Sequence, residues 1–245
     1  MKAVSLPFQY TLVRRSRRRT LTIIVNPENQ VRVLAPGFLS ESKIKEFLRR
    51  KSSWVLKQIE KNIHRPKPEQ RRYEPGEKFS FLGNELTLEI RESGRGAIEF
   101  IPDRLIVTVP EKLQGEERRS YIAWRVEDWY RAEAVKVFRE RVARYQDFLG
   151  PQPRSVRVKE FRSQWGSASR RGSLSFNWRL LLAPFEVLDY VVIHELVHLE
   201  HMNHSVRFWK RVGEILPGYK LCRRWLSAHG RFLRLELKKK QVENH

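Results

Sequence analysis

The sequence of 245 residues predicts an α+β fold, with antiparallel β-hairpins and helices in its N-terminal part and a mostly helical C-terminal part. Three observations predict this class. Short runs that alternate or are rich in β-branched residues are concentrated before residue 112. A long amphipathic pattern at helical spacing begins at residue 116. A further helical run around residue 190 is apolar almost all round, but histidine and glutamate interrupt it.

The first strands are expected at residues 10–15, 20–25 and 31–34, with a turn at 27–29. An arginine cluster between the first two runs is expected at the tip of a hairpin; it consists of Arg14, Arg15, Arg17, Arg18 and Arg19. One helix should follow, because Ser40 is a suitable N-cap and apolar residues recur at helical intervals as far as Asn62. Residues 64–75 are polar and contain three prolines, which predicts a linker.

A second group of strands is expected at residues 78–82, 85–90 and 105–109, and Gly83-Asn84 predicts a two-residue hairpin loop. The long helix is expected from Glu116 to Phe148, before Gly150 and Pro151 end it. Its expected apolar side consists of Ile122, Trp124, Trp129, Val135, Phe138, Val142 and Tyr145.

In the last third of the chain, strands are expected at residues 155–161 and 173–177. Pro184 suits the first turn of a helix that includes residue 190, and further helices are expected at 205–215 and 219–239. These elements suggest two regions: a β-rich one at residues 1–112, and a catalytic one at residues 113–245 that begins with the long helix.

The helical run around residue 190 contains the pattern His194-Glu-Leu-Val-His198. On a helix this spacing places both imidazoles on one face, one turn apart, where they can share a metal ion. In such H-E-x-x-H motifs the two histidines bind zinc and the glutamate, here Glu195, is the general base. Polar groups inside an apolar helix need partners, and a metal ion is one.

A catalytic zinc site usually has three protein ligands, so a third is sought among three residues. His204 is preferred, because it lies six residues after His198, as in the longer H-E-x-x-H-x-x-G-x-x-H motif. Asn203 tolerates left-handed backbone and would end the helix before it. His201 would share the helix face, and Glu214 on the following helix is the third alternative.

Residues around this motif resemble the YgjP-like metal-dependent hydrolases, which are related to the SprT-like and WLM zinc peptidases. The match is dense from Arg162 to Trp209 and extends, more weakly, to an N-terminal basic hairpin and a helix with Trp54. It comprises Trp165-Gly-Ser-Ala-Ser169, Phe176-Asn-Trp-Arg-Leu180, the segment from Asp189 to His198, and Asn203-His-Ser-Val-Arg-Phe-Trp209.

The resemblance implies a zincin-like catalytic core in which His194, His198 and His204 bind the metal and Glu195 is the catalytic base. One residue departs from the family pattern, since Ala168 stands where the family usually has cysteine. The departure argues against cysteine chemistry in that loop.

Four residues are candidates for substrate binding. They are Trp165, Asn177, Arg162 and Arg179. Either arginine would suit an oxyanion or a phosphate, and a salt bridge to a carboxylate is the alternative for both. The strand before the metal helix is expected to border the cleft, with residues 174–176 as the edge that pairs with an extended substrate. Phe208 and Trp209 are expected to pack behind the metal helix.

Lysine and arginine total 49 against 28 acidic residues, a formal net charge of +21 that favours anionic partners and non-specific polyanion binding. A single cysteine, Cys222, excludes an intrachain disulfide and fits a reducing cytoplasm. No apolar run has the roughly 20 residues that cross a bilayer, so a cytoplasmic protein without membrane contact is expected. The sequence leaves the oligomeric state open.

The favoured hypothesis is therefore a hydrolase that uses one zinc ion, although other divalent metals would fit, and that acts on peptides. The basic composition keeps a nucleoside triphosphate pyrophosphohydrolase as the alternative. A second alternative is a nucleic-acid or ribosome adaptor with structural zinc. Such a closed site normally has four protein ligands, often cysteine, and only Cys222 is present.

Overall fold

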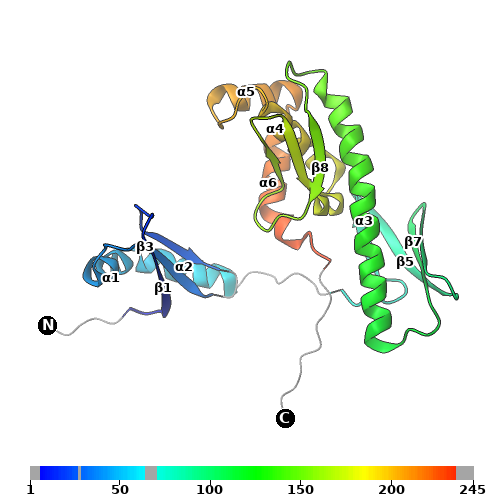
Figure 1. The fold of residues 1–245 in the computed structure, drawn as a ribbon, viewed down its shortest axis with the longest axis horizontal. Helices are drawn as coiled ribbons and strands as arrows, with labels where there is room; N and C mark the ends of the chain where they lie inside the picture. Colours follow the sequence, from blue (N-terminus) through cyan, green and yellow to red (C-terminus); the bar gives the residue numbers. More distant parts are fainter. Residues whose placement is uncertain (1–5, 27–28, 64–70, 236–245) are drawn as a thin grey trace, which may run out of the picture. The chain divides into compact units, whose positions relative to one another are not determined.

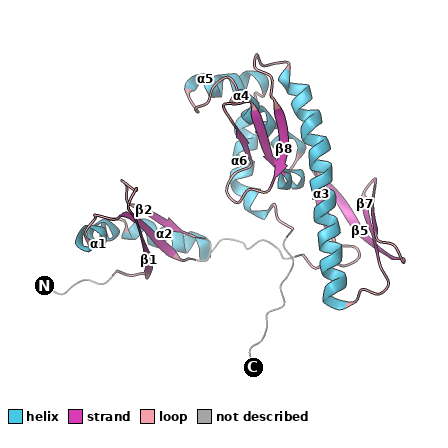
Figure 2. Cartoon of the chain, viewed as in Figure 1, coloured by secondary structure: helices cyan, strands magenta, loops and turns pink. Residues whose placement is uncertain are grey.

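The structure is a computed structural model that describes residues 6–26, 29–63 and 71–235. Its elements confirm the α+β class (Figures 1 and 2). The chain divides into two compact units, Met1–Lys67 and Pro68–His245. The boundary suggested between residues 112 and 113 lies inside the larger unit. The division into regions 1–112 and 113–245 stays a prediction, as does its alternative of one continuous domain.

The smaller unit contains a three-stranded sheet, β1 (Tyr10–Arg15), β2 (Thr22–Val25) and β3 (Val31–Pro36). The order is β1-β3-β2, with β1 parallel and β2 antiparallel to β3. The prediction of a hairpin between the first two strands is therefore wrong, because both strands pair with β3 and not with each other. The most apolar strand, β3, takes the centre, where Val33 and Ala35 are fully buried. Arg14 donates hydrogen bonds to the carbonyls of Gly37 and Leu39, so this arginine fastens the loop after β3.

Two helices follow this sheet where the sequence predicts one. They are α1 (Glu41–Arg50) and α2 (Ser52–Ile63), and the single predicted helix is wrong at Lys51. The amide of Lys51 donates to Phe47 and the amide of Val55 donates to Lys51, so the break keeps these backbone hydrogen bonds. It also lets α2 contact β2 and bury Val55.

The larger unit begins with a four-stranded sheet of order β4-β5-β7-β6, in which only the β5–β7 pair is parallel. Its strands are β4 (Lys78–Phe81), β5 (Asn84–Glu92), β6 (Ala97–Ile101) and β7 (Arg104–Val109). The β4–β5 turn is Leu82-Gly83 and not Gly83-Asn84 as expected. Both turn residues have positive φ angles, 52° and 89°, which suits a tight hairpin, and the Leu82 amide donates to Leu181 at 2.7 Å.

The remaining elements of this unit are α3 (Gly115–Gln146), β8 (Ser155–Lys159), β9 (Gly166–Ala168), β10 (Ser173–Asn177), the 3₁₀ helix η1 (Trp178–Leu182), α4 (Phe185–Val197), α5 (Val206–Ile215), α6 (Tyr219–His229) and η2 (Gly230–Phe232). The second sheet has the order β8-β10-β9. Neither β6 nor β9 was predicted, because their residues show no strong alternation. The predicted helix 219–239 is too long: Gly230 starts a 3₁₀ turn, and residues 236–239 lie outside the described residues, as do 64–70 of the predicted linker.

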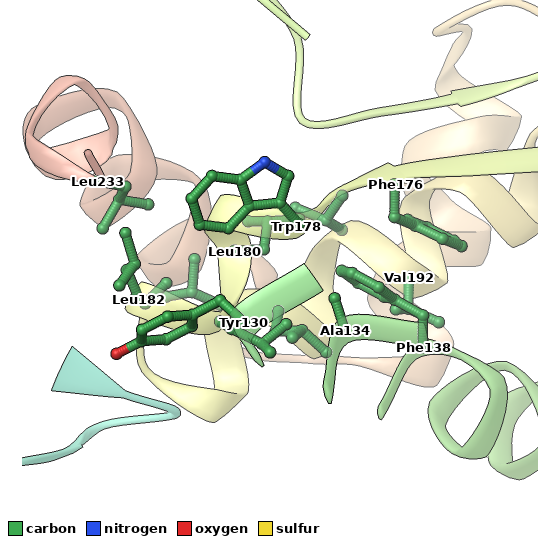
Figure 3. Close-up of a cluster of buried hydrophobic side chains, with 14 of the residues drawn as sticks. Tyr130, Ala134, Phe138, Phe176, Trp178, Leu180, Leu182, Val192 and Leu233 are labelled. Atoms are coloured by element: carbon green, nitrogen blue, oxygen red, sulfur yellow. The ribbon is translucent and has the colours of Figure 1, made fainter. Parts of the chain in front are cut away.

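Helix α3 joins the two sheets of this unit. Around its middle Trp129 and Tyr130 pack on Phe81 of the first sheet, and further along Phe138 stacks on Phe176 of β10 at 4.6 Å. Figure 3 shows the resulting core, in which Trp178 and Val192 lie near α3. Trp124 and Val135 are exposed, contrary to the predicted apolar side. Trp124 lies nearly opposite the buried Ile122 around the helix, because two residues turn an α-helix by about 200°.

A buried ion pair fastens α3 to α4. Arg141 and Asp189 form two hydrogen bonds of 2.7 Å, and the hydroxyl of Tyr145 donates to the same carboxylate at 2.7 Å. Both charged residues are more than nine-tenths buried. The pair therefore fixes α4 in rotation and along its axis. None of the described helices has the length and apolarity needed to cross a membrane.

Replacing Arg141 with methionine should lower the free energy of unfolding by about 3–5 kcal/mol, because the carboxylate of Asp189 stays buried without its partner. Urea unfolding measures this loss. The matched control is Arg139→Met on the exposed side of the same helix, which should cost less than ~0.5 kcal/mol. Equal effects of the two substitutions would contradict a special role for the pair.

Candidate metal centre

Helix α4 is the most enclosed helix of the larger unit. It contacts α3, α5, α6, β9 and β10, and nearly every side chain from Val187 to Val197 is buried. Such a helix must be apolar on all sides, as its sequence is. His194, Glu195 and His198 are the polar residues at its C-terminal end, where Glu195 and His198 are buried and His194 is half-buried.

The structure brings three histidines together: His194, His198 and His204. One ring nitrogen from each lies within 4.8 Å of the others. The Nε2 atoms of His194 and His204 are 3.0 Å apart, a separation that requires a hydrogen bond or a shared cation. In a tetrahedral zinc site the ligand nitrogens would be about 3.4 Å apart, so small movements complete the geometry. Among the described residues these three form the one group of this kind.

His204 reaches the cluster through a sharp turn after α4. The helix ends at Val197, not near Asn203 as expected, because Leu199, Glu200 and His201 donate their amides to Leu196 and Val197. The other two candidates for the third ligand lie outside the cluster. His201 contributes its carbonyl oxygen, 3.0 Å from Nδ1 of His198, and Glu214 pairs with Arg211.

The chemistry of the three histidines fits a metal ion. The contact of Nδ1 of His198 with a carbonyl selects the tautomer that leaves Nε2 free for a ligand bond. Burial, together with the neighbouring His198 and His204, lowers the pKa of His194 to about 3, and burial also lowers the pKa of His198. Both imidazoles are therefore neutral near pH 7, as metal ligands must be.

Glu195 is 5% exposed and its Oε2 has no hydrogen-bond partner among the described residues. Burial raises its pKa to about 8, and a cation at the histidines would counteract this shift. The carboxylate lies against the backbone of Gly166 on β9. A Cβ atom at Gly166 would lie 2.6 Å from Oε1 of Glu195, so a side chain at this position would displace the carboxylate. The sequence analysis did not single out this glycine.

Strand β9 is the free edge beside the site, whereas residues 174–176, expected there, lie in the central strand β10. That expectation is wrong because β9 was not predicted. The amides of Asn177 and Ser169 donate to Trp165 and Ser173, so hydrogen-bonded pairs alternate along the ladder. The backbone groups of Gly166 and Ala168 consequently point away from β10, to the open edge.

Aromatic rings support the histidines. Phe208 is fully buried, with its ring centroid 4.5–4.9 Å from those of His194, His198 and His204. Trp209 stacks on His204 at 5.6 Å and on Tyr219 at 5.5 Å. These rings hold the third histidine from the side away from α4. Sequence analysis placed Phe208 and Trp209 behind the metal helix, but their contacts are with the imidazoles themselves.

The four candidates for substrate binding line one small pocket of about 220 Å³. Asn177 is buried there, donating to the carbonyls of Phe161 and Gln164 and accepting from the amide of Arg179. Arg179 forms a 2.7 Å ion pair with Glu160. Trp165 packs over Gly230, and Arg162 is exposed. A role of these residues toward a substrate stays a prediction.

Comparison with known proteins gives one family match. A family model described as the YgjP-like metallopeptidase domain matches residues 19–229, which include the three histidines and Glu195. The crystal structure of the metallopeptidase zymogen of Pyrococcus abyssi abylysin shares 25% sequence identity. The similarity covers 41% of this chain and 99% of that one, with a TM-score of 0.35. No curated protein matches the chain.

Titration of chelator-treated protein with Zn²⁺ should show one ion per chain, because the described residues hold one three-histidine group. Replacing His204 with alanine should weaken the affinity at least ~100-fold, since it removes one of three ligands. His229→Ala is the matched control, because His229 lies on α6 outside the cluster. Calorimetry measures both, and unchanged affinity in the His204 variant would contradict the assignment.

Proposed function

The chain belongs to the YgjP-like metallopeptidase family, a family of metal-dependent hydrolases, and we propose that it is a zinc-dependent peptidase. The observation that carries the proposal is the three-histidine group with a buried glutamate beside an open strand edge. His194, His198 and His204 would hold the ion. When bound, zinc would supply a Lewis acid that activates water and the substrate carbonyl.

Glu195 would move the proton in this reaction. Its carboxylate accepts a proton from the attacking water as the oxygen adds to the amide carbon. The same oxygen of Glu195 then delivers the proton to the leaving nitrogen as the C–N bond breaks. Glu195 is buried, so bulk water is kept from its carboxyl group while the proton passes from the attacking water to the leaving amine.

The edge of β9 would align the substrate. An extended peptide can pair with the outward backbone groups of Gly166 and Ala168, as an added strand does. Gly166 lies against Glu195, so this pairing brings a peptide bond beside the proposed base. An open strand edge beside the base suits an extended peptide better than a compact nucleotide.

The site also favours catalysis over a structural role for zinc. Structural zinc sites are normally closed by four protein ligands. Among the described residues, neither a fourth histidine nor a cysteine or carboxylate joins the three histidines. A structural site with both histidine and cysteine ligands would need Cys222, but this residue is buried on α6 and is not part of the group.

Incubation of the zinc-loaded protein with a peptide library and with a panel of nucleoside triphosphates tests the proposal by mass spectrometry. Peptide cleavage is expected, and Glu195→Gln should reduce it at least ~1,000-fold while the bound zinc is retained. Glu214→Gln, which removes a carboxylate outside the cluster, is the control. Hydrolysis of nucleotides alone would overturn the peptidase proposal.

Gly166→Ala should reduce kcat by about tenfold or more with little change in zinc content, because the added methyl group displaces the carboxylate of Glu195. Gly218→Ala is the matched control, since an added Cβ there meets no atom within 4 Å. Steady-state kinetics and metal analysis of both variants measure the effect. Full activity in the Gly166 variant would contradict the close packing.

A further inference from the structure

A second pocket, of about 470 Å³, lies beside the candidate metal centre. Its wall includes three arginines, Arg154, Arg170 and Arg171, together with the apolar side chains of Leu199 and Met202. The arginines come from the segment before β8 and from the β9–β10 turn, and the apolar residues come from the turn after α4. Three different parts of the larger unit therefore build this arginine pocket.

The arginine pocket lies at the end of the β8-β10-β9 sheet, where β9 stops. Ser169, which lines it, directly follows Ala168, and Leu199 directly follows the proposed ligand His198. Strand residues advance about 3.3 Å each, so the pocket begins about 10 Å from Gly166 and the carboxylate of Glu195. A peptide paired with β9 would therefore pass the pocket about three residues from the bond beside Glu195.

The charges in this pocket are uncompensated. Among the described residues none of its three arginines forms an ion pair, whereas Arg141, Arg179 and Arg211 elsewhere in the unit pair with carboxylates. Residues 151–235 contain 15 lysines and arginines and 6 acidic residues, so the surroundings reinforce the positive field. Like charges that share one pocket repel each other, and an anionic ligand would relieve the repulsion.

We propose that the arginine pocket is a substrate subsite for a glutamate or aspartate side chain about three residues from the scissile bond. This inference rests on the proposed peptidase function and adds a substrate class to it. The guanidinium groups would bind the carboxylate through paired hydrogen bonds. Leu199 and Met202 would contact the methylene groups of the side chain.

The continuity with β9 favours a peptide as the source of this carboxylate. The outward backbone groups of Gly166 and Ala168 can pair with an extended main chain, and the next residue, Ser169, belongs to the wall of the pocket. Binding in the pocket would then fix the register of the peptide, because a one-residue shift would move the acidic side chain to the opposite face.

The experiment starts from a peptide that the zinc-loaded protein cleaves. Glutamate, glutamine or lysine is placed at each of four positions on either side of the bond, and kcat/KM is measured. We expect glutamate to exceed glutamine about tenfold or more at one position near the third residue, on one side only. The variant Arg170→Glu/Arg171→Glu should reverse this preference in favour of lysine, and the milder Arg170→Gln/Arg171→Gln should abolish it.

The matched control is Lys57→Glu/Lys61→Glu, which changes the net charge equally on an exposed face of α2 in the smaller unit. It should keep the glutamate preference. Cleavage of all peptides at equal rates, or a preference that survives reversal of Arg170 and Arg171, would overturn the subsite.

A binding measurement separates this inference from the proposed function. The Glu195→Gln protein is titrated with fluorescent extended peptides that differ only in one glutamate, glutamine or lysine, chosen whether or not the active protein cleaves them, and the anisotropy gives Kd. If the glutamate peptide binds more tightly and this preference depends on Arg170 and Arg171, the subsite is supported. Absence of cleavage together with this binding preference would refute only the peptidase activity. Equal Kd values for the glutamate and glutamine peptides would overturn the subsite while leaving cleavage unaffected.

Discussion

The larger unit depends on one constraint: α4 must be buried on all sides and still present His194, Glu195 and His198 together. Apolar packing from Val187 to Val197 meets the first requirement, and the ion pair of Arg141 with Asp189 fixes the helix against α3. The three polar side chains lie together at its C-terminal end, where Glu195 and His198 are themselves buried. The end of α4 therefore sets the position of the candidate metal centre.

Each neighbour of α4 has a separate task at the site. Strand β9 limits the position of Glu195 through the close approach of Gly166, and the rings of Phe208 and Trp209 hold His204 in place. The four-stranded sheet contributes at a distance, because α3 packs on it around Trp129 and carries Arg141 about three turns further along. Residues far from the histidines therefore determine how accurately they meet.

Helical periodicity and motif spacing predicted the helices that position the site. His204, the preferred third ligand, lies beside His194 and His198. Pairing between distant segments could not be predicted in this way. Three residues of β9 are too few to show alternation, so residues 174–176 were taken for the edge strand. The end of α4 was misplaced for a similar reason, because no glycine or proline marks it and only the amide hydrogen bonds of residues 199–201 do.

The separation of His204 from its partners along the chain has a further consequence. His204 follows His194 by ten positions in the chain and belongs to the connection that leads into α5. An ion shared by both would act as a cross-link that closes this loop, which lowers the entropy of the unfolded chain as well as stabilising the folded one. A bound cation would thus link the end of α4 to the connection before α5, in addition to its proposed chemical role.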